Sequence, residues 1–186
     1  MSGSGSTSFG TGPVAASFLG SIMPDSAFHR DVTLSELGHG AGYFLWGFRA
    51  FAFGRHQCGC LKRGYNVLFD ALSNDVLNDI SDLSALLGRV GGRRIKLAKP
   101  GCMHVTHDEA SLLAAICAAQ DGDVDLRDAH LSWLMAGDAD QRVSYICERV
   151  GGLFRVIGYP INAPGQQVTH EEPSVSLNSL QVVGTA

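Results

Sequence analysis

The sequence has few charged residues and no long apolar run, and both shortages restrict what the protein can be. Asp, Glu, Lys and Arg make up 17% of the 186 residues, below the roughly 25% usual for globular domains. The formal net charge is −4, which disfavours nucleic-acid binding, because proteins that bind nucleic acids usually carry excess positive charge. No stretch approaches the roughly 18 apolar residues that a membrane-spanning helix needs. We therefore expect no transmembrane segment, and a sparsely charged surface that contacts a protein partner.

The signatures of familiar enzyme classes are also missing. The chain has no GxSxG, Walker A, HExxH or paired CxxC motif. The run Gly38-His-Gly-Ala-Gly42 is not a GxGxxG phosphate-binding loop, and no predicted strand precedes it. The sequence therefore names no reaction and no resident cofactor, and it favours a non-enzymatic role without excluding an enzyme.

Cysteine is present in an odd number, five, at positions 58, 60, 102, 117 and 147. A disulfide framework cannot include all five, and secreted scaffolds carry denser cysteine in shorter chains. No basic residue precedes Arg30, whereas a secretory signal begins with a positively charged region. We therefore predict a protein of the reducing cytoplasm.

Composition divides the chain into three parts. Residues 1–30 begin with Gly/Ser-rich linker sequence, which predicts a flexible N-terminal segment. Residues 31–160 have a helical hydrophobic pattern almost throughout and are the predicted domain. Residues 161–186 lack that period and contain two prolines, which predicts a flexible C-terminal tail.

The helical pattern of the middle part predicts an all-α fold. Residues 41–54 contain six aromatic residues and are apolar nearly all round, as in a helix that is buried on several sides. Five further apolar segments follow, around residues 61–72, 76–90, 110–117, 126–135 and 143–157. Because the connections are short, we expect antiparallel neighbours in a single up-and-down bundle of five to six helices.

Local signals place the predicted helix ends. Capping boxes stand at Thr33–Glu36 and Thr106–Glu109. Further starts are predicted at Ser73 or Asp75, at Asp125 and at Asp138, and glycines at 91–92 and 137 predict ends. The pair Gly151-Gly152 inside the last helix predicts either a close helix contact or a bend.

One group of residues could bind a metal ion. It consists of two clusters about 45 residues apart, each in or beside a predicted connection between helices. The clusters are His56, Cys58 and Cys60, and Cys102, His104 and His107. Mixed Cys and His ligands suit a tetrahedral zinc site. Against this, a CxC step within a helix separates its thiols widely, so isolated, partly buried cysteines or a thiol switch are competing interpretations.

Charge is unevenly distributed along the chain. Residues 55–99 hold eight basic and four acidic residues, a net charge of +4, whereas residues 100–150 hold three basic and nine acidic residues, a net charge of −6. A basic cluster follows the third predicted helix, and it consists of Arg89, Arg93, Arg94, Lys96 and Lys99. It is either a solvated edge or the binding site of an acidic partner.

The segments FRAFAFGR, RRIKLAKPGC and THDEASLL, in this order, resemble a small family of uncharacterised helical proteins from alphaproteobacteria. The resemblance covers about residues 43–158. It implies a helical fold and no activity, cofactor or partner. Members of the family often carry several adjacent cysteines where this chain has the single Cys102 between Gly101 and Met103.

Two hypotheses of function follow. The first is a non-enzymatic intracellular adaptor or regulatory protein that acts through protein–protein contacts. The alternative is a metal-binding or redox-sensing helical module that uses the two Cys/His clusters. The sequence defines neither the partner nor the oligomeric state.

Overall fold

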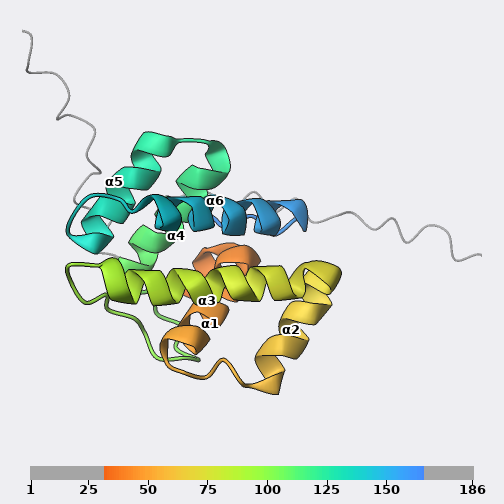
Figure 1. Ribbon diagram of the computed structural model, residues 1–186. Coiled ribbons are helices and arrows are strands. Elements are labelled where there is room, and N and C mark those ends of the chain that lie inside the picture. Colours follow the sequence, from red (N-terminus) through yellow and green to blue (C-terminus); the bar gives the residue numbers. More distant parts are fainter. Residues whose placement is uncertain (1–31, 166–186) are drawn as a thin grey trace, which may run out of the picture. The chain divides into compact units, whose positions relative to one another are not determined.

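The structure, a computed structural model, describes residues 32–165 (Figure 1). The predicted segment 1–30 and residues 166–186 of the predicted tail lie outside this range. The predicted all-α class is confirmed, and within the described range extended backbone pairs only at an isolated bridge between Thr33 and His104. The helices are α1 (Gly38–Ala52), α2 (Gly59–Phe69), α3 (Ser73–Val90), α4 (His107–Asp121), α5 (Val124–Met135) and α6 (Gln141–Val156), with 3-10 turns η2 (Leu34–Glu36) and η3 (Asp70–Leu72).

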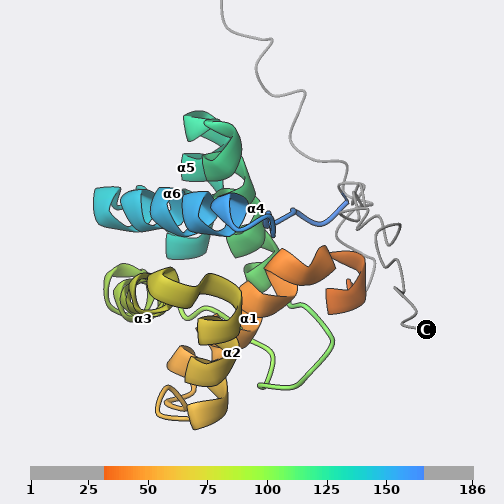
Figure 2. The same cartoon turned by 90° about the vertical axis from the view of Figure 1, so that its right-hand side faces the viewer.

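Helix α3 lies between two groups of helices. It packs against α1 and α2 on one side and against α6 on the other, and α6 in turn packs against α4 (Figures 1 and 2). Helices α4 and α5 form the most extensive pair, joined by a tight turn at Gly122, whose φ of 75° lies in the left-handed region that glycine tolerates. No helix in the described range is both long and apolar enough to cross a bilayer.

The aromatic residues of α1 form the centre of the core, as the sequence predicts. Phe44 and Phe48 are buried and stack on each other with ring centroids 5.7 Å apart. Phe154 of α6 contacts Phe44 and Phe69 edge to face, at centroid distances of 6.3 and 4.9 Å. These contacts join α1, α2 and α6 in one hydrophobic cluster, and aromatic pairs of this kind add to the stabilisation that burial provides.

Several helix starts differ from the predicted ones by one or two residues. Ser73 is the first residue of α3 instead of its cap, and its hydroxyl donates to Oδ1 of Asn66 at 2.6 Å. Helix α5 is capped by Asp123, whose carboxylate accepts from the amide of Leu126, and not by Asp125. Helix α6 is capped by Asp140 and not by Asp138. For α5 and α6 a neighbouring aspartate supplies the acceptor, whereas the cap position of α3 is Leu72, which has no capping side chain.

Three glycines in or next to the helices differ in what their positions require. Gly91 ends α3 in an extended conformation, without the left-handed turn that its position predicts. Gly151 confirms the predicted close contact, because a Cβ at this position would lie 2.7 Å from Cγ of Gln120 on α4. At Gly40 in α1, an added methyl group would collide with the carbonyl oxygens of Tyr159 and Pro160.

Candidate functional site

Residues 91–106 connect α3 to α4 without forming a helix, and the first turn of α4 holds this connection in place. The carboxylate of Asp108 accepts two hydrogen bonds from the guanidinium of Arg93, at 2.9 and 3.1 Å, and a third from the amide of Lys96 at 2.6 Å. Burial opposes the ionisation of Asp108, but the hydrogen bonds from Arg93 and Lys96 outweigh it, so the pKa of Asp108 lies below its ordinary value.

The next residue of α4, Glu109, forms a buried ion pair with Arg49 of α1. Two guanidinium nitrogens of Arg49 donate to its carboxylate at 2.7 and 2.8 Å, and the two side chains are 2% and 0% exposed. Glu109 also accepts from the amides of Ala98 and Thr106, at 3.1 and 2.9 Å. The predicted capping box at Thr106–Glu109 is confirmed, and its glutamate has this second role in the core.

Arg49 completes the attachment of the connection through its remaining donors. It donates to the carbonyl oxygen of Cys102 at 2.7 Å and to that of His104 at 2.8 Å. A buried charge is tolerated only where its hydrogen-bonding groups are paired. The pair Arg49–Glu109 meets this condition by binding backbone groups of the connection.

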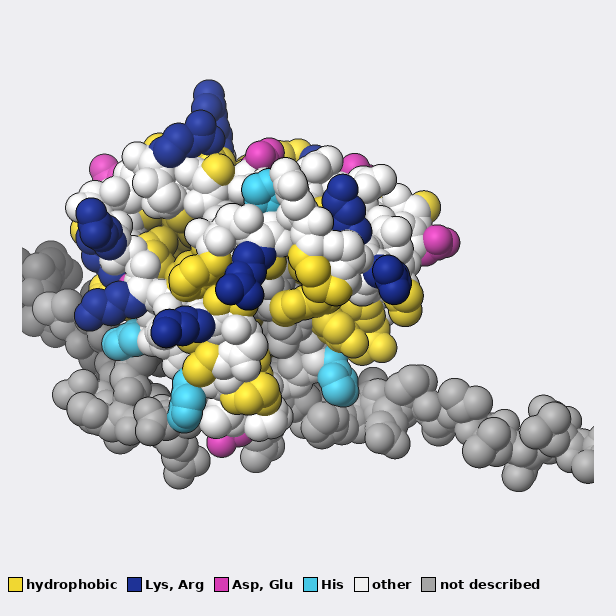
Figure 3. Space-filling model, turned by 90° about the horizontal axis from the view of Figure 1, so that it is seen from below, with side chains coloured by type: hydrophobic (Ala, Val, Ile, Leu, Met, Phe, Trp, Pro, Cys, Tyr) yellow, Lys and Arg dark blue, Asp and Glu magenta, His cyan; other side chains and the backbone are white. Residues whose placement is uncertain are grey.

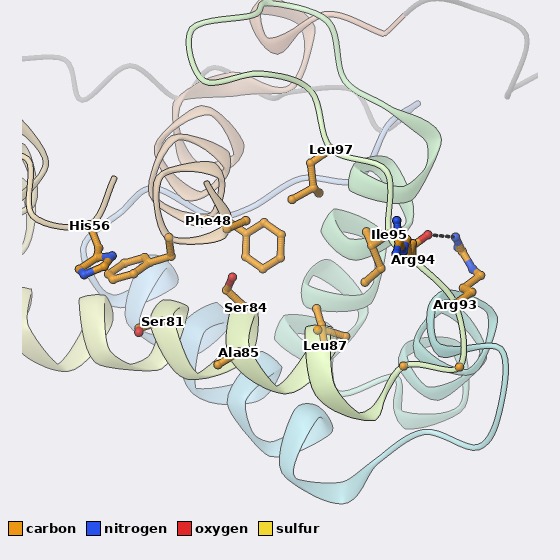
Figure 4. A pocket seen from close by; sticks show the side chains of 15 residues that line it. Phe48, His56, Ser81, Ser84, Ala85, Leu87, Arg93, Arg94, Ile95 and Leu97 are labelled. Atoms are coloured by element: carbon orange, nitrogen blue, oxygen red, sulfur yellow. Dashed lines mark hydrogen bonds between the residues drawn. The ribbon is translucent and has the colours of Figure 1, made fainter. Parts of the chain in front are cut away.

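The first part of the connection forms one wall of a cavity of 680 Å³ (Figure 4). Phe51 of α1 and Ala85 of α3 supply accessible apolar surface above the buried Phe48 and Leu87, and Ile95 and Leu97 close the side formed by the connection. The hydroxyl groups of Ser81 and Ser84 on α3 are the uncharged polar side chains of the lining. The volume is within the range of protein ligand sites, and the lining combines apolar side chains with serine, histidine and arginine.

Positive charge borders this cavity. Arg93 and Arg94 line it on the side of the connection, and His56 lines it near the end of α1, where its ring stacks on Phe51 at a centroid distance of 6.1 Å. In the view of Figure 3, Lys and Arg side chains surround apolar patches, and Asp and Glu are few. The chain has no acidic residue between Glu36 and Asp70.

Of the predicted basic cluster, Arg93 and Arg94 line the cavity, whereas Arg89, Lys96 and Lys99 are not part of its lining. Arg94, Lys96 and Lys99 are exposed. Arg93 is held by Asp108, and its guanidinium lies 4.4 Å from the ring centroid of Trp133. Exposed Arg89 donates to a carbonyl oxygen of its own helix. Arg93 therefore positions the connection, whereas Arg94, Lys96 and Lys99 form no ion pair with any residue of the range 32–165.

The predicted metal ligands are not gathered in one place. Within residues 32–165, no three His, Cys, Asp or Glu side chains lie close enough together to hold a metal ion. Cys58 and Cys60 form a disulfide, a state in which their sulfurs are not thiolate ligands. They can meet because Cys58 precedes α2 in an extended conformation, so the separation expected of a CxC step inside a helix does not apply.

The other predicted ligands have separate environments. His56 lines the cavity, and Cys102 and His104 lie on the connection, where their carbonyl oxygens bind Arg49. His107 stacks on Trp133 at a centroid distance of 4.9 Å. The zinc alternative therefore stays a prediction from composition, without support from the geometry of the described residues.

Two features of the structure were not anticipated from the sequence. One is the pairing of Arg49 with Glu109; the available signal was a single charged side chain within an apolar helix. The other is a hydrogen bond of 3.1 Å between the Ser111 hydroxyl and Nδ1 of His130. Ser111 is buried, and neither residue lines the cavity.

The fold and the site define an all-α protein with a cation-bordered apolar cavity. In comparisons with protein-family models, curated proteins and solved structures, no match to this chain was found. The resemblance to the alphaproteobacterial helical family therefore stays a prediction.

Proposed function

We propose that the protein is a non-enzymatic adaptor or regulatory protein that binds an acidic segment of a protein partner at the cavity between α1, α3 and residues 91–97. The observation that carries the proposal is the combination of an apolar floor with a positively charged edge in one open cavity. Apolar side chains of the partner would occupy the floor, and its carboxylates would face the cations.

The composition of the floor favours a peptide that carries hydrophobic side chains. Phe51, Ala85, Ile95 and Leu97 offer accessible apolar surface from three different elements. Burial of apolar surface stabilises a complex by about 25 cal/mol per Å² before the costs of association. Because hot spots of binding lie in such desolvated pockets, one or two large apolar side chains of the partner account for most of the affinity.

The charges at the edge favour an acidic partner. Arg94, Lys96 and Lys99 are exposed on the connection, and their side chains form no ion pair in the described range. Nucleic acid is the weaker candidate for the anion, because single-stranded binding platforms expose aromatic side chains between their cations, and residues 89–99 contain none. Complementary charge increases the association rate and the specificity of the contact.

Site-specific photo-crosslinking in cells that express the intact chain tests the proposal. A photoreactive amino acid replaces Ala85, which is exposed and lines the cavity. We expect a discrete adduct whose crosslinked peptide, identified by mass spectrometry, is acidic. The matched control carries the same group at Ala129, which is exposed on α5 and does not line the cavity.

The double substitution Arg94→Glu/Lys96→Glu should abolish the adduct at position 85. The substitution spares Arg93, whose replacement would release the connection from Asp108 and so change the cavity itself. The proposal is wrong if position 85 yields no adduct, if position 129 yields the same one, or if the charge reversal leaves the adduct unchanged.

A further inference from the structure

The disulfide between Cys58 and Cys60 lies in the exposed connection between α1 and α2. Only Gly59 separates the two cysteines, whose Cα atoms are 5.3 Å apart. Both cysteines are exposed, as is every residue from Ala52 to Cys60. Closing so short a loop restricts the unfolded chain only slightly, so the bond contributes little to the stability of the fold. Exposed disulfides of this kind are the ones that take part in exchange reactions.

The position of Cys58 and Cys60 at the start of α2 also stabilises their reduced form. Cys58 is the N-cap residue of the 11-residue helix α2, and no side chain caps this helix. The first amide groups of a helix lack partners within the helix, and the helix dipole is positive at this end. The amide of Leu61 already donates to the carbonyl oxygen of Cys58, and a Cys58 thiolate would accept from the amides of this end that remain, as an Asp or Ser cap does.

The charges along the chain at the pair are positive. Arg55 precedes the cysteines, and exposed Lys62 and Arg63 follow them in α2. No acidic residue occurs between positions 36 and 70 of the sequence. Positive surroundings stabilise a thiolate and attract an anionic reaction partner.

We propose that Cys58 and Cys60 form a reversible thiol–disulfide exchange site for a small anionic thiol such as glutathione. A glutathione thiolate attacks one cysteine sulfur, the S–S bond of the pair breaks, and its electron pair leaves with the other cysteine as a thiolate. A second glutathione thiolate then attacks the glutathione sulfur of the mixed disulfide and releases the remaining cysteine. The pair gains two electrons, the two glutathione molecules become glutathione disulfide, and the two thiol protons pass to the cysteines or to solvent.

Equilibration of the full chain in buffers of increasing ratio of glutathione to glutathione disulfide tests the exchange. After acid quenching and alkylation, mass spectrometry counts the free thiols. We expect two thiols to appear in one two-electron step and to map to Cys58 and Cys60. The variant Cys58→Ser should lose this two-electron step and instead form a single glutathione adduct on Cys60. The variant Cys102→Ser should show the same step as the wild type. A pair that stays in one state at all ratios, or a step that maps to other cysteines, overturns the proposal.

The preference for an anionic thiol is tested by comparing the rates at which two thiol reagents reduce the disulfide. The variant Lys62→Glu/Arg63→Glu should slow reduction by glutathione about tenfold, the loss expected when electrostatic steering is reversed, while reduction by cysteamine, whose attacking thiolate is balanced by its ammonium group, keeps its rate. The matched control reverses two exposed charges elsewhere, Arg89→Glu/Arg142→Glu, and should leave both rates unchanged. Equal slowing of both reagents by the first variant would overturn the charge preference. The exchange site does not depend on the acidic partner, so either proposal can fail alone.

Discussion

His130 is a half-buried histidine whose two ring nitrogens have different environments. Nδ1 is hydrogen-bonded to Ser111, whereas Nε2 is buried and has no hydrogen-bond partner among the described residues. A protonated ring would need a partner for Nε2 as well, because both nitrogens then carry a proton. Burial accordingly lowers the pKa of His130 below its ordinary value of 6.5.

This depressed pKa predicts that the protein loses stability in mild acid. The unfolded chain binds a proton at His130 more readily than the folded one, so the free energy of unfolding is fully retained above pH 6.5 and falls as the pH decreases toward the folded pKa. Urea unfolding at pH 7.5 and at pH 5 should show the decrease, and His130→Gln should remove most of it. The expectation fails if the variant shows the same difference between the two pH values as the wild type.

Among the helices, α1 shows how glycine sets the distance between chain segments. The carbonyl groups of Tyr159 and Pro160, after α6, lie directly against Gly40, so the described chain returns to the start of α1 at this point. Gly42, two residues further along, has no such neighbour. The two glycines therefore differ in their tolerance of a methyl group although they lie in the same helix.

Replacing these glycines with alanine should have opposite effects on the free energy of unfolding. Gly40→Ala should destabilise the protein by about 1–3 kcal/mol, because the methyl group meets rigid backbone oxygens and forces a displacement. Gly42→Ala should stabilise it by up to about 1 kcal/mol, the helix-propensity gain of alanine over glycine. Chemical denaturation of both variants compares the two, and a stabilising Gly40→Ala would show that the segment after α6 does not pack on α1.

The helices themselves could be predicted from the sequence because their signals are local. Apolar stripes such as Val76, Ile80, Leu83 and Leu87 recur at helical spacing, and all four residues are buried as predicted. The same spacing also predicts that Val90 is buried, and this prediction is wrong, because Val90 is 43% exposed at the end of α3. The starts of α5 and α6 shifted by two residues because several Asp residues of equal capping ability stand close together.

The site could be predicted only in part, because its geometry depends on contacts between distant residues. The basic cluster was found from charge alone, but the sequence does not show that Asp108 holds Arg93 while Arg94 stays exposed. The pairing of Arg49 with Glu109 spans 60 positions and has no periodic signal. The disulfide was missed because Cys58 was assigned helical geometry, although it lies just before α2.

For the molecule as a whole, two ion pairs join the part formed by α1–α3 to the part formed by α4–α6. Arg49 of α1 binds Glu109 of α4 in the core, and Arg149 of α6 binds Asp79 of α3 at 3.0 Å. The first pair is fully buried, whereas Arg149 is 42% exposed. Loss of one partner of a buried pair leaves an uncompensated charge, so the first pair is the more critical link.

We expect Arg49→Met to lower the free energy of unfolding by about 3–5 kcal/mol, because Glu109 is then left buried without its cation. The added substitution Glu109→Gln, which keeps acceptors for the amides of Ala98 and Thr106, should restore part of this loss. The control Arg155→Met removes a pair whose side chains are 52% and 57% exposed and should cost about 1 kcal/mol or less.

Denaturant titrations followed by circular dichroism and by tryptophan fluorescence measure these changes in both parts, since Trp46 is in α1 and Trp133 is in α5. Coincident transitions are expected if the two parts unfold together. Equal losses for Arg49→Met and Arg155→Met would contradict the importance of the buried pair.

The attachment of residues 91–106 has a consequence for how this protein can change during evolution. The contacts to Arg49 come from the backbone carbonyls of Cys102 and His104, and those to Glu109 come from backbone amides. Since every residue offers a carbonyl group and every residue except proline an amide, most side chains of this connection can be exchanged while its path is kept. Mutation at positions such as Arg94 and Ile95 can therefore alter what the cavity recognises, because these residues do not belong to a helix whose sequence pattern must be kept.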